Sequence, residues 1–231
     1  MIRDRAAAVR ERIARAASRA GRGAGEVTLV AVSKTFPPEA VREAFEAGLR
    51  DFGENKVQEA EKKLGALQPL RGQGARFHLV GHLQGNKARR AAQLFDLIHS
   101  VDSIELGQRL EHLGAELGRA VEVLVQVDLA GEETKFGLDE THLFPALQAL
   151  RGLKRVRVKG LMTLPPLVEP EAVRPFFRRL RGLAERAHRE GLLYACELSM
   201  GMSGDLEVAI EEGATMVRVG TAIFGERSPK A

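Results

Sequence analysis

The sequence predicts an α/β protein in which a single (β/α)8 barrel of the TIM type spans residues 1–231 and an extra helix lies at its N-terminus. Eight short apolar runs alternate with stretches of helical spacing, as is typical of parallel βαβ units. The first run is apolar throughout rather than alternating, which indicates a strand buried on both faces. No change in composition and no linker divides the chain, so we expect one domain.

The elements follow one another in a regular cycle. A helix is expected over 3–22, where apolar residues recur at helical spacing with arginines between them. The first strand covers 27–32, and the next helix begins at Pro37-Pro38 and ends at Gly48, the usual placement of these two residue types. The later strands begin near 49, 77, 97, 121, 156, 197 and 215, and the later helices are expected around 55–67, 86–94, 103–118, 139–151, 170–190 and 204–212.

An open, doubly wound sheet is the alternative fold. Such a sheet that binds a dinucleotide carries a glycine-rich turn directly after its first strand. Here the glycine-rich stretch 21–25 precedes that strand. The order of the two segments therefore favours the barrel.

Composition excludes several classes of protein. The net charge is only +4, from 35 basic and 31 acidic residues, and the arginines of the first helix fit a solvated face better than a nucleic-acid site. The single thiol, Cys196, excludes an internal disulfide framework and fits a reducing compartment. No apolar run approaches the roughly 20 residues of a membrane span. We therefore expect a cytoplasmic protein that does not bind membranes. Binding of nucleic acid through the arginine-rich first helix is a weaker alternative.

Polar residues after the first three strands are candidates for a site, because the chemistry of such barrels lies where strands end. Lys34 follows the first strand, where partial desolvation would lower its pKa and let it attack an aldehyde; a lysine that reaches solvent at the rim is the alternative. Asn55 follows the second strand and would either face the site or cap the next helix. His78 and His82 have no obvious third ligand, so we expect no metal site.

The loops after the last two strands resemble a phosphate cradle. The seventh strand leads into glycines and Ser203, at the expected N-cap of a helix, and the eighth leads into Gly220 and Thr221. Glycines let backbone N–H groups converge on an anion, and barrels often bind phosphate in these two loops; two ordinary tight turns are the alternative. The carboxylate of Asp205 must then face away from the anion.

Three features together suit one cofactor. They are Lys34, the phosphate cradle and Arg218, which stands two residues before Gly220. A phosphorylated aldehyde joined to Lys34 as a Schiff base would use all three features. Pyridoxal 5'-phosphate (PLP) is such a cofactor.

Seven motifs run in the same order as in a known family: 31–35, 52–59, 78–87, 100–102, 160–163, 198–203 and 217–225. Over nearly its whole length the sequence resembles the pyridoxal phosphate homeostasis proteins, also called the proline synthase co-transcribed family. The resemblance implies a barrel similar to the cofactor domain of alanine racemase and a role in vitamin B6 and amino-acid homeostasis.

The resemblance also implies roles for single residues. Lys34 would carry PLP as an internal aldimine, and Asn55 would lie beside the ring. Arg218 would face the pyridine nitrogen. The phosphate would be held by Ser203, Gly220 and Thr221, and the pocket lined by Met162 and Met202.

Two features favour a carrier over an enzyme, so no catalytic residue is assigned. A guanidinium only donates hydrogen bonds, so Arg218 would face an unprotonated pyridine nitrogen, which makes the ring a weak electron sink. Two-base racemisation needs a second group, which in alanine racemase is a tyrosine from another domain, whereas Tyr194 precedes the seventh strand. We expect a monomer that passes PLP to apoenzymes. The alternative is a low-activity amino-acid racemase that uses Lys34 and a rim histidine or water.

Overall fold

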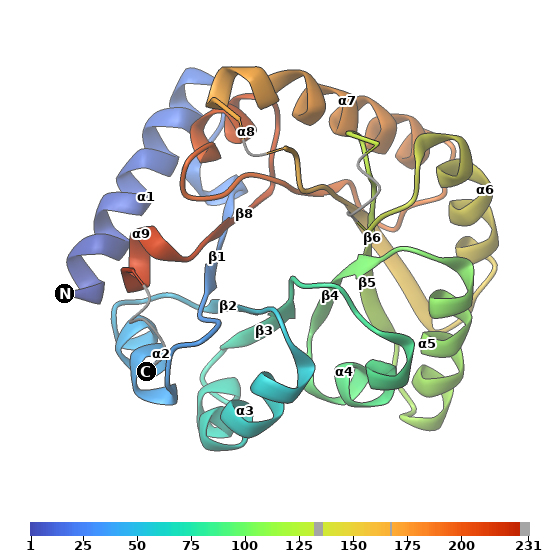
Figure 1. The fold of residues 1–231 in the computed structure, drawn as a ribbon, viewed down its shortest axis with the longest axis horizontal. Helices are drawn as coiled ribbons and strands as arrows, with labels where there is room; N and C mark the ends of the chain where they lie inside the picture. The colour runs from blue at the N-terminus through green and yellow to red at the C-terminus, as the bar shows by residue number, and fades with distance from the viewer. Residues whose placement is uncertain (132–135, 167, 227–231) are drawn as a thin grey trace.

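The computed structural model describes residues 1–131, 136–166 and 168–226, and its strands form a closed parallel barrel (Figure 1). Each strand pairs with its neighbours in sequence, and β1 also pairs with β8. The strands are β1 (Thr28–Val32), β2 (Asp51–Glu54), β3 (Arg76–Leu79), β4 (Leu97–Val101), β5 (Val121–Gln126), β6 (Val156–Met162), β7 (Glu197–Ser199) and β8 (Met216–Val219). The predicted (β/α)8 fold is confirmed.

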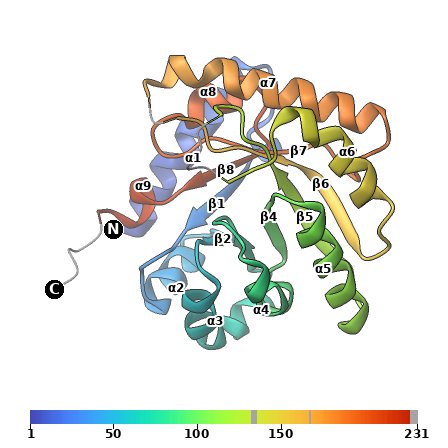
Figure 2. The ribbon, with the colours of Figure 1, turned by 45° about the vertical axis from the view of Figure 1, so that its right-hand side comes forward.

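One helix follows each of the first seven strands and lies on the outside of the barrel (Figures 1 and 2). These helices are α2 (Pro38–Glu46), α3 (Val57–Arg71), α4 (Ala88–Leu94), α5 (Ile104–Glu116), α6 (Glu140–Arg151), α7 (Pro170–Arg189) and α8 (Leu206–Glu211). Short 3-10 turns, η1 (Ala24–Glu26) and η2 (Gly85–Lys87), precede β1 and α4. In the part of the chain that the structure describes, no helix is long and apolar enough to cross a membrane.

The N-terminal helix α1 (Ile2–Arg19) completes the outer ring. Within the described residues, strand β8 is followed by the four-residue helix α9 (Thr221–Phe224), which is too short to cover the seam between β8 and β1. Helix α1 packs against α8, α9 and α2 and so covers that seam (Figure 1). Its buried face consists of Ile2, Ala6, Val9, Ile13, Ala16 and Ala17. The extra helix predicted from the sequence therefore occupies the eighth position of the ring.

Two apolar clusters lie on the two sides of the strands. The larger one fills the layer between the barrel and the helices. The smaller one comprises Val30, Val32, Val80, Leu97, Leu124, Met162 and Met216. These residues stand at alternate positions of their strands, so they share the inner face and fill the barrel.

Strands β6 and β7 approach each other so closely at Gly160 that no side chain fits. A Cβ atom at Gly160 would lie 1.9 Å from the carbonyl oxygen of Glu197 and 2.6 Å from its backbone nitrogen. Gly160 pairs with Glu197 in the register of these two strands. The close approach belongs to rigid backbone, which cannot move aside without breaking the pairing.

We predict that Gly160→Ala lowers the free energy of unfolding by about 3 kcal/mol, because the added methyl group forces two paired strands apart. Urea unfolding followed by circular dichroism measures this value. Gly182→Ala is the matched control, because a Cβ atom there has no neighbour within 4 Å and the residue lies within α7. It should stabilise the protein by up to about 1 kcal/mol, since alanine favours helix over glycine. Equal unfolding midpoints for the two variants would contradict this account.

Candidate functional site

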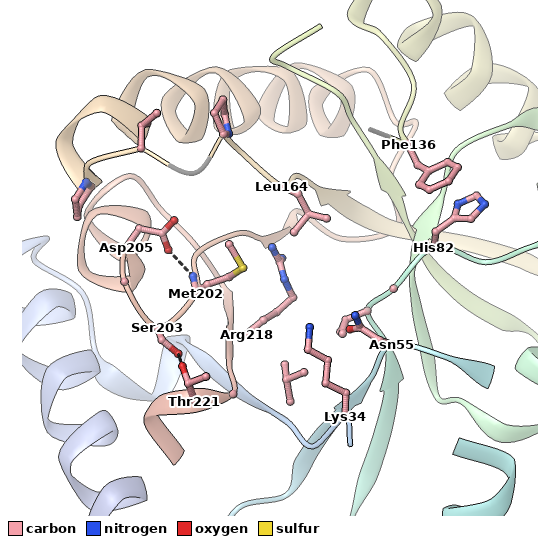
Figure 3. A pocket seen from close by; sticks show the side chains of 18 of the residues that line it. Lys34, Asn55, His82, Phe136, Leu164, Met202, Ser203, Asp205, Arg218 and Thr221 are labelled. Atoms are coloured by element: carbon pink, nitrogen blue, oxygen red, sulfur yellow. Dashed lines mark hydrogen bonds between the residues drawn. The ribbon is translucent and has the colours of Figure 1, made fainter. Parts of the chain in front are cut away.

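A cavity of about 690 Å³ opens at the carboxyl ends of the strands (Figure 3). It is lined by residues that follow β1, β2, β3, β5, β6, β7 and β8, and by Val32 of β1 and Arg218 of β8. All six residues singled out in the sequence line it: Lys34, Asn55, Ser203, Arg218, Gly220 and Thr221. Met202 lines it as well, whereas Met162 is fully buried in the apolar cluster inside the barrel and is not among the lining residues.

Lys34 lies in a turn that is held in an uncommon backbone conformation. The next residue, Thr35, has a φ of 70° and is the only non-glycine residue with a positive φ in the described ranges. This conformation is costly for a β-branched residue and persists only where its surroundings impose it. Here the carboxylate of Glu59 on α3 accepts a hydrogen bond from the backbone N–H of Thr35. The contact fixes the turn from which the Lys34 side chain extends into the cavity (Figure 3).

A buried ion pair supports the same turn from the outer side of the barrel. Glu54 accepts hydrogen bonds from the Ser33 hydroxyl at 2.6 Å and from the Lys63 ammonium at 2.7 Å. Lys63 also donates to the carbonyl of Ser33 at 2.8 Å. Burial raises the pKa of Glu54, although Lys63 and Ser33 act against this shift. Two hydrogen bonds therefore hold Ser33, the residue directly before Lys34, to α3 and β2.

Asn55 faces the cavity and does not cap the following helix. Helix α3 begins at Val57 with Lys56 at the N-cap position and no side-chain cap, so the capping interpretation of Asn55 is wrong. A Cβ atom at Gly81 would lie 2.2 Å from the carbonyl oxygen of Asn55. The loops after β2 and β3 therefore touch through backbone, which places the Asn55 side chain at the cavity wall.

The loops after β7 and β8 meet on the opposite side of the cavity. The hydroxyls of Ser203 and Thr221 lie 3.3 Å apart, with Thr221 as donor (Figure 3). Asp205 accepts a hydrogen bond from the backbone N–H of Met202 at 2.5 Å, so its carboxylate is engaged within its own loop. The predicted N-cap at Ser203 is wrong, because this turn extends to Asp205 and α8 begins only at Leu206. The Ser203 hydroxyl is thereby left at the cavity rather than at a helix end, whereas Thr221 is the first residue of α9.

Arg12 of α1 holds the Ser203 loop from outside the barrel. Its guanidinium donates to the carbonyl of Ser203 at 2.9 Å and makes two hydrogen bonds to Glu207, at 2.6 and 2.8 Å. The bidentate pair with Glu207 fixes the orientation of the guanidinium. Helix α1 thus contributes directly to the geometry of the cavity.

Arg218 reaches the floor of the cavity from inside the barrel. Only 4% of the residue is exposed, and its guanidinium donates to Ser199 Oγ at 2.6 Å and to the carbonyl of Thr163 at 2.9 Å. Burial lowers the pKa of Arg218 to about 10, while the negative charge of Asp205 acts in the opposite direction. The side chain is therefore still a cation at neutral pH, and it donates hydrogen bonds only.

The two histidines of the third unit have separate surroundings. His82 lines the cavity, stacks on Phe136 with a centroid separation of 3.5 Å, and places Nδ1 3.1 Å from an oxygen of Asp102. Burial raises the pKa of Asp102, and the proximity of His82 acts against that shift. His78 is buried inside the barrel. Among the described residues, no group of three or more His, Cys, Asp or Glu is arranged to hold a metal ion.

Sequence reasoning missed the residues that hold the site from behind: Arg12, Glu54, Glu59, Lys63, Thr163 and Ser199. Glu54, Glu59, Thr163 and Ser199 lie within the motifs 52–59, 160–163 and 198–203, which gave them no individual role. Lys63 lies outside the motifs but carried a signal of its own. It stands beside Leu64 and between Ala60 and Leu67 on the buried face of α3, where a lysine needs a partner.

The chain is similar in sequence and in fold to several known proteins. Residues 5–228 match the family model described as "Alanine racemase, N-terminal domain". A protein of Aquifex aeolicus named pyridoxal phosphate homeostasis protein is 45% identical over 225 residues, which is 97% of each chain. PipY of Synechococcus elongatus, solved with PLP bound, is 41% identical, with a TM-score of 0.86 over 97% of this chain and all of that one. Alanine racemase of Corynebacterium glutamicum, 22% identical, shares the fold with a TM-score of 0.66 over 97% of this chain and 62% of its own.

We predict that Arg12→Ala speeds amide hydrogen exchange in the segment 201–206 by about fivefold, because the loop loses a hydrogen bond from a charged group worth about 1 kcal/mol. Hydrogen–deuterium exchange with mass spectrometry measures the rate. Arg15→Ala is the control, since Arg15 lies one turn along the same helix and pairs with Glu11. Equal exchange rates in the two variants would show that Arg12 does not hold the loop.

Proposed function

The chain belongs to the alanine racemase N-terminal domain family and, within it, to the pyridoxal phosphate homeostasis proteins, and we propose that it binds PLP covalently on Lys34. In this proposal residues 1–231 act as one PLP-binding domain in the cytoplasm. The protein holds the cofactor and takes part in vitamin B6 and amino-acid homeostasis. The proposal is supported by PipY, whose solved structure contains PLP and whose chain is 41% identical.

The observation that carries the proposal is the arrangement of complementary groups around one cavity. Lys34 faces it from β1, Arg218 from β8, and the hydroxyls of Ser203 and Thr221 from the last two loops (Figure 3). The volume of about 690 Å³ is within the range of small-molecule sites. The amine of Lys34 suits the aldehyde of PLP, and the buried cation of Arg218 suits the ring nitrogen. The two hydroxyls suit the phosphate.

Each side chain has a role that follows from its chemistry. PLP supplies an aldehyde that condenses with primary amines. Lys34 provides the amine, held by the strained turn at Thr35. The hydroxyls of Ser203 and Thr221, together with Gly220, which lines the same cavity, would hold the phosphate. Asn55, which lines the cavity wall, would lie beside the ring.

The floor of the cavity favours storage over catalysis. Arg218 donates hydrogen bonds and holds its charge in a buried site, so it keeps a facing ring nitrogen unprotonated. A pyridine ring with an unprotonated nitrogen is a weak electron sink, so it stabilises a carbanion poorly. We propose on this basis a PLP carrier with no catalytic residues of its own. The proposal includes that it acts as a monomer and delivers PLP to apoenzymes.

The position of the tyrosine also argues against two-base racemisation. Tyr194 precedes β7, so it lies at the end of the barrel opposite the cavity. It is 42% exposed, and its hydroxyl accepts a hydrogen bond from Arg151 of α6 at 2.9 Å. Tyr194 therefore has no access to a substrate in the cavity.

Borohydride reduction after incubation with PLP, followed by peptide mass mapping, tests the attachment. We predict a pyridoxyl-phosphate adduct on Lys34 and loss of the absorption band of the bound cofactor in Lys34→Ala. Lys56→Ala is the control, because Lys56 also follows a barrel strand but does not line the cavity. An adduct on another lysine would overturn the assignment.

Exchange of the Cα proton of alanine in deuterated water distinguishes a carrier from a racemase. We predict that the PLP-loaded protein exchanges this proton no faster than Lys34→Ala with an equal concentration of PLP. Turnover that requires Lys34 would favour the racemase, with His82 as the candidate for the second base because it lines the cavity beside Asp102.

A further inference from the structure

A row of polar side chains crosses the interior of the barrel and ends on the guanidinium of Arg218. Its other members are Asp51 of β2, His78 of β3, His99 of β4 and Ser199 of β7. His99 and Ser199 are fully buried, and Asp51, the most exposed of the five, is 9% exposed. Groups this deeply buried must satisfy one another, because water does not reach them.

Every link in this row has the length of a hydrogen bond. Arg218 Nη1 donates to Ser199 Oγ at 2.6 Å, and Ser199 Oγ lies 2.8 Å from His99 Nδ1. His99 Nε2 lies 2.9 Å from His78 Nδ1. His78 Nε2 lies 3.0 Å from Asp51 Oδ1. The row is therefore continuous from the amino end of β2 to the floor of the cavity.

The two ends determine which atom donates at every link. An ionised Asp51 only accepts, so His78 Nε2 carries a proton and donates to it. At the other end the guanidinium only donates, so the Ser199 oxygen accepts from Arg218 and the Ser199 hydroxyl donates to His99 Nδ1. His99 Nε2 then carries the proton of that ring and donates to His78 Nδ1.

The surroundings of the row support these protonation states. Burial would raise the pKa of Asp51, but its hydrogen bonds with His78 and Arg76 and the proximity of these two residues outweigh burial and leave this pKa below its usual value. Arg76 donates to Asp51 Oδ1 at 2.8 Å. Burial, together with the proximity of His78 and Arg218, holds the pKa of His99 well below its usual range. Asp51 is thus ionised and His99 neutral at physiological pH.

We propose that this one-way chain of hydrogen bonds positions Arg218, with His78, His99 and Ser199 acting as positioning residues. Because the Ser199 hydroxyl donates its proton to His99, a lone pair of the Ser199 oxygen faces the guanidinium of Arg218. The carbonyl of Thr163 holds the second nitrogen, at 2.9 Å. These two contacts fix the guanidinium of Arg218 where the residue lines the cavity. The inference rests on the proposed role of Arg218 opposite the cofactor ring.

Nitrogen-15 NMR of the histidine side chains tests the direction of the chain in the unsubstituted protein without cofactor. We expect His78 and His99 to be neutral at pH 7 with the proton on Nε2 in both rings. A proton on Nδ1 of either ring, or a charged ring, would overturn the proposal. This measurement does not depend on PLP, so its result is separate from the attachment of the cofactor to Lys34.

A pair of variants tests the effect on Arg218. Ser199→Ala removes one of the two acceptors of Arg218, and we expect PLP to dissociate about tenfold faster, the size of effect typical of one hydrogen bond to a charged group. Thr215→Val is the control. It removes a half-buried hydroxyl that donates to Glu197, outside the row.

The spectra of the same variants separate positioning from a general loss of packing. Ser199→Ala should shift the Nδ1 resonance of His99, because this nitrogen loses its donor, whereas Thr215→Val should leave it unchanged. An unchanged His99 resonance in Ser199→Ala, or equally fast loss of PLP in the two variants, would overturn the positioning role.

Discussion

Pairing of β1 with β8 is the constraint on which the site depends. Closure places Val30 beside Arg218 and Ala31 beside Val219, although these residues are almost a full chain length apart. The strands are all parallel, so their carboxyl ends lie on one rim, and the loops after β1, β7 and β8 become neighbours. Helix α1 protects this seam because it packs on α8 and α9 at the position that a long helix after β8 would otherwise fill.

Closure also creates a dry interior in which a charge is costly. A guanidinium moved from water into such a site loses much of its hydration, which is why burial depresses the pKa of Arg218. The barrel offsets this cost with acceptors of fixed geometry, the Ser199 hydroxyl and the Thr163 carbonyl. The apolar residues around them exclude water and strengthen each of these contacts.

The cavity is supported from the outside as well. The Glu54–Lys63 pair holds Ser33 next to Lys34, and Arg12 holds the carbonyl of Ser203. In both cases a side chain on a surrounding helix restrains the backbone of a loop that carries a site residue. Loops restrained in this way can present Lys34 and Ser203 in fixed positions, because rigid elements rather than solvent determine their geometry.

The sequence by itself determined the barrel, the place of Lys34, Asn55 and Arg218 around one rim, and the two loops with Ser203 and Thr221. Local patterns were sufficient for this, because apolar runs define the strands and parallel closure brings every strand end to the same face. Only the tertiary structure decided that Met162 faces the barrel interior and that Asn55 leaves its helix uncapped. It also decided that His99 meets Ser199, 100 residues away, since such contacts depend on barrel register and on side-chain packing that no linear spacing encodes.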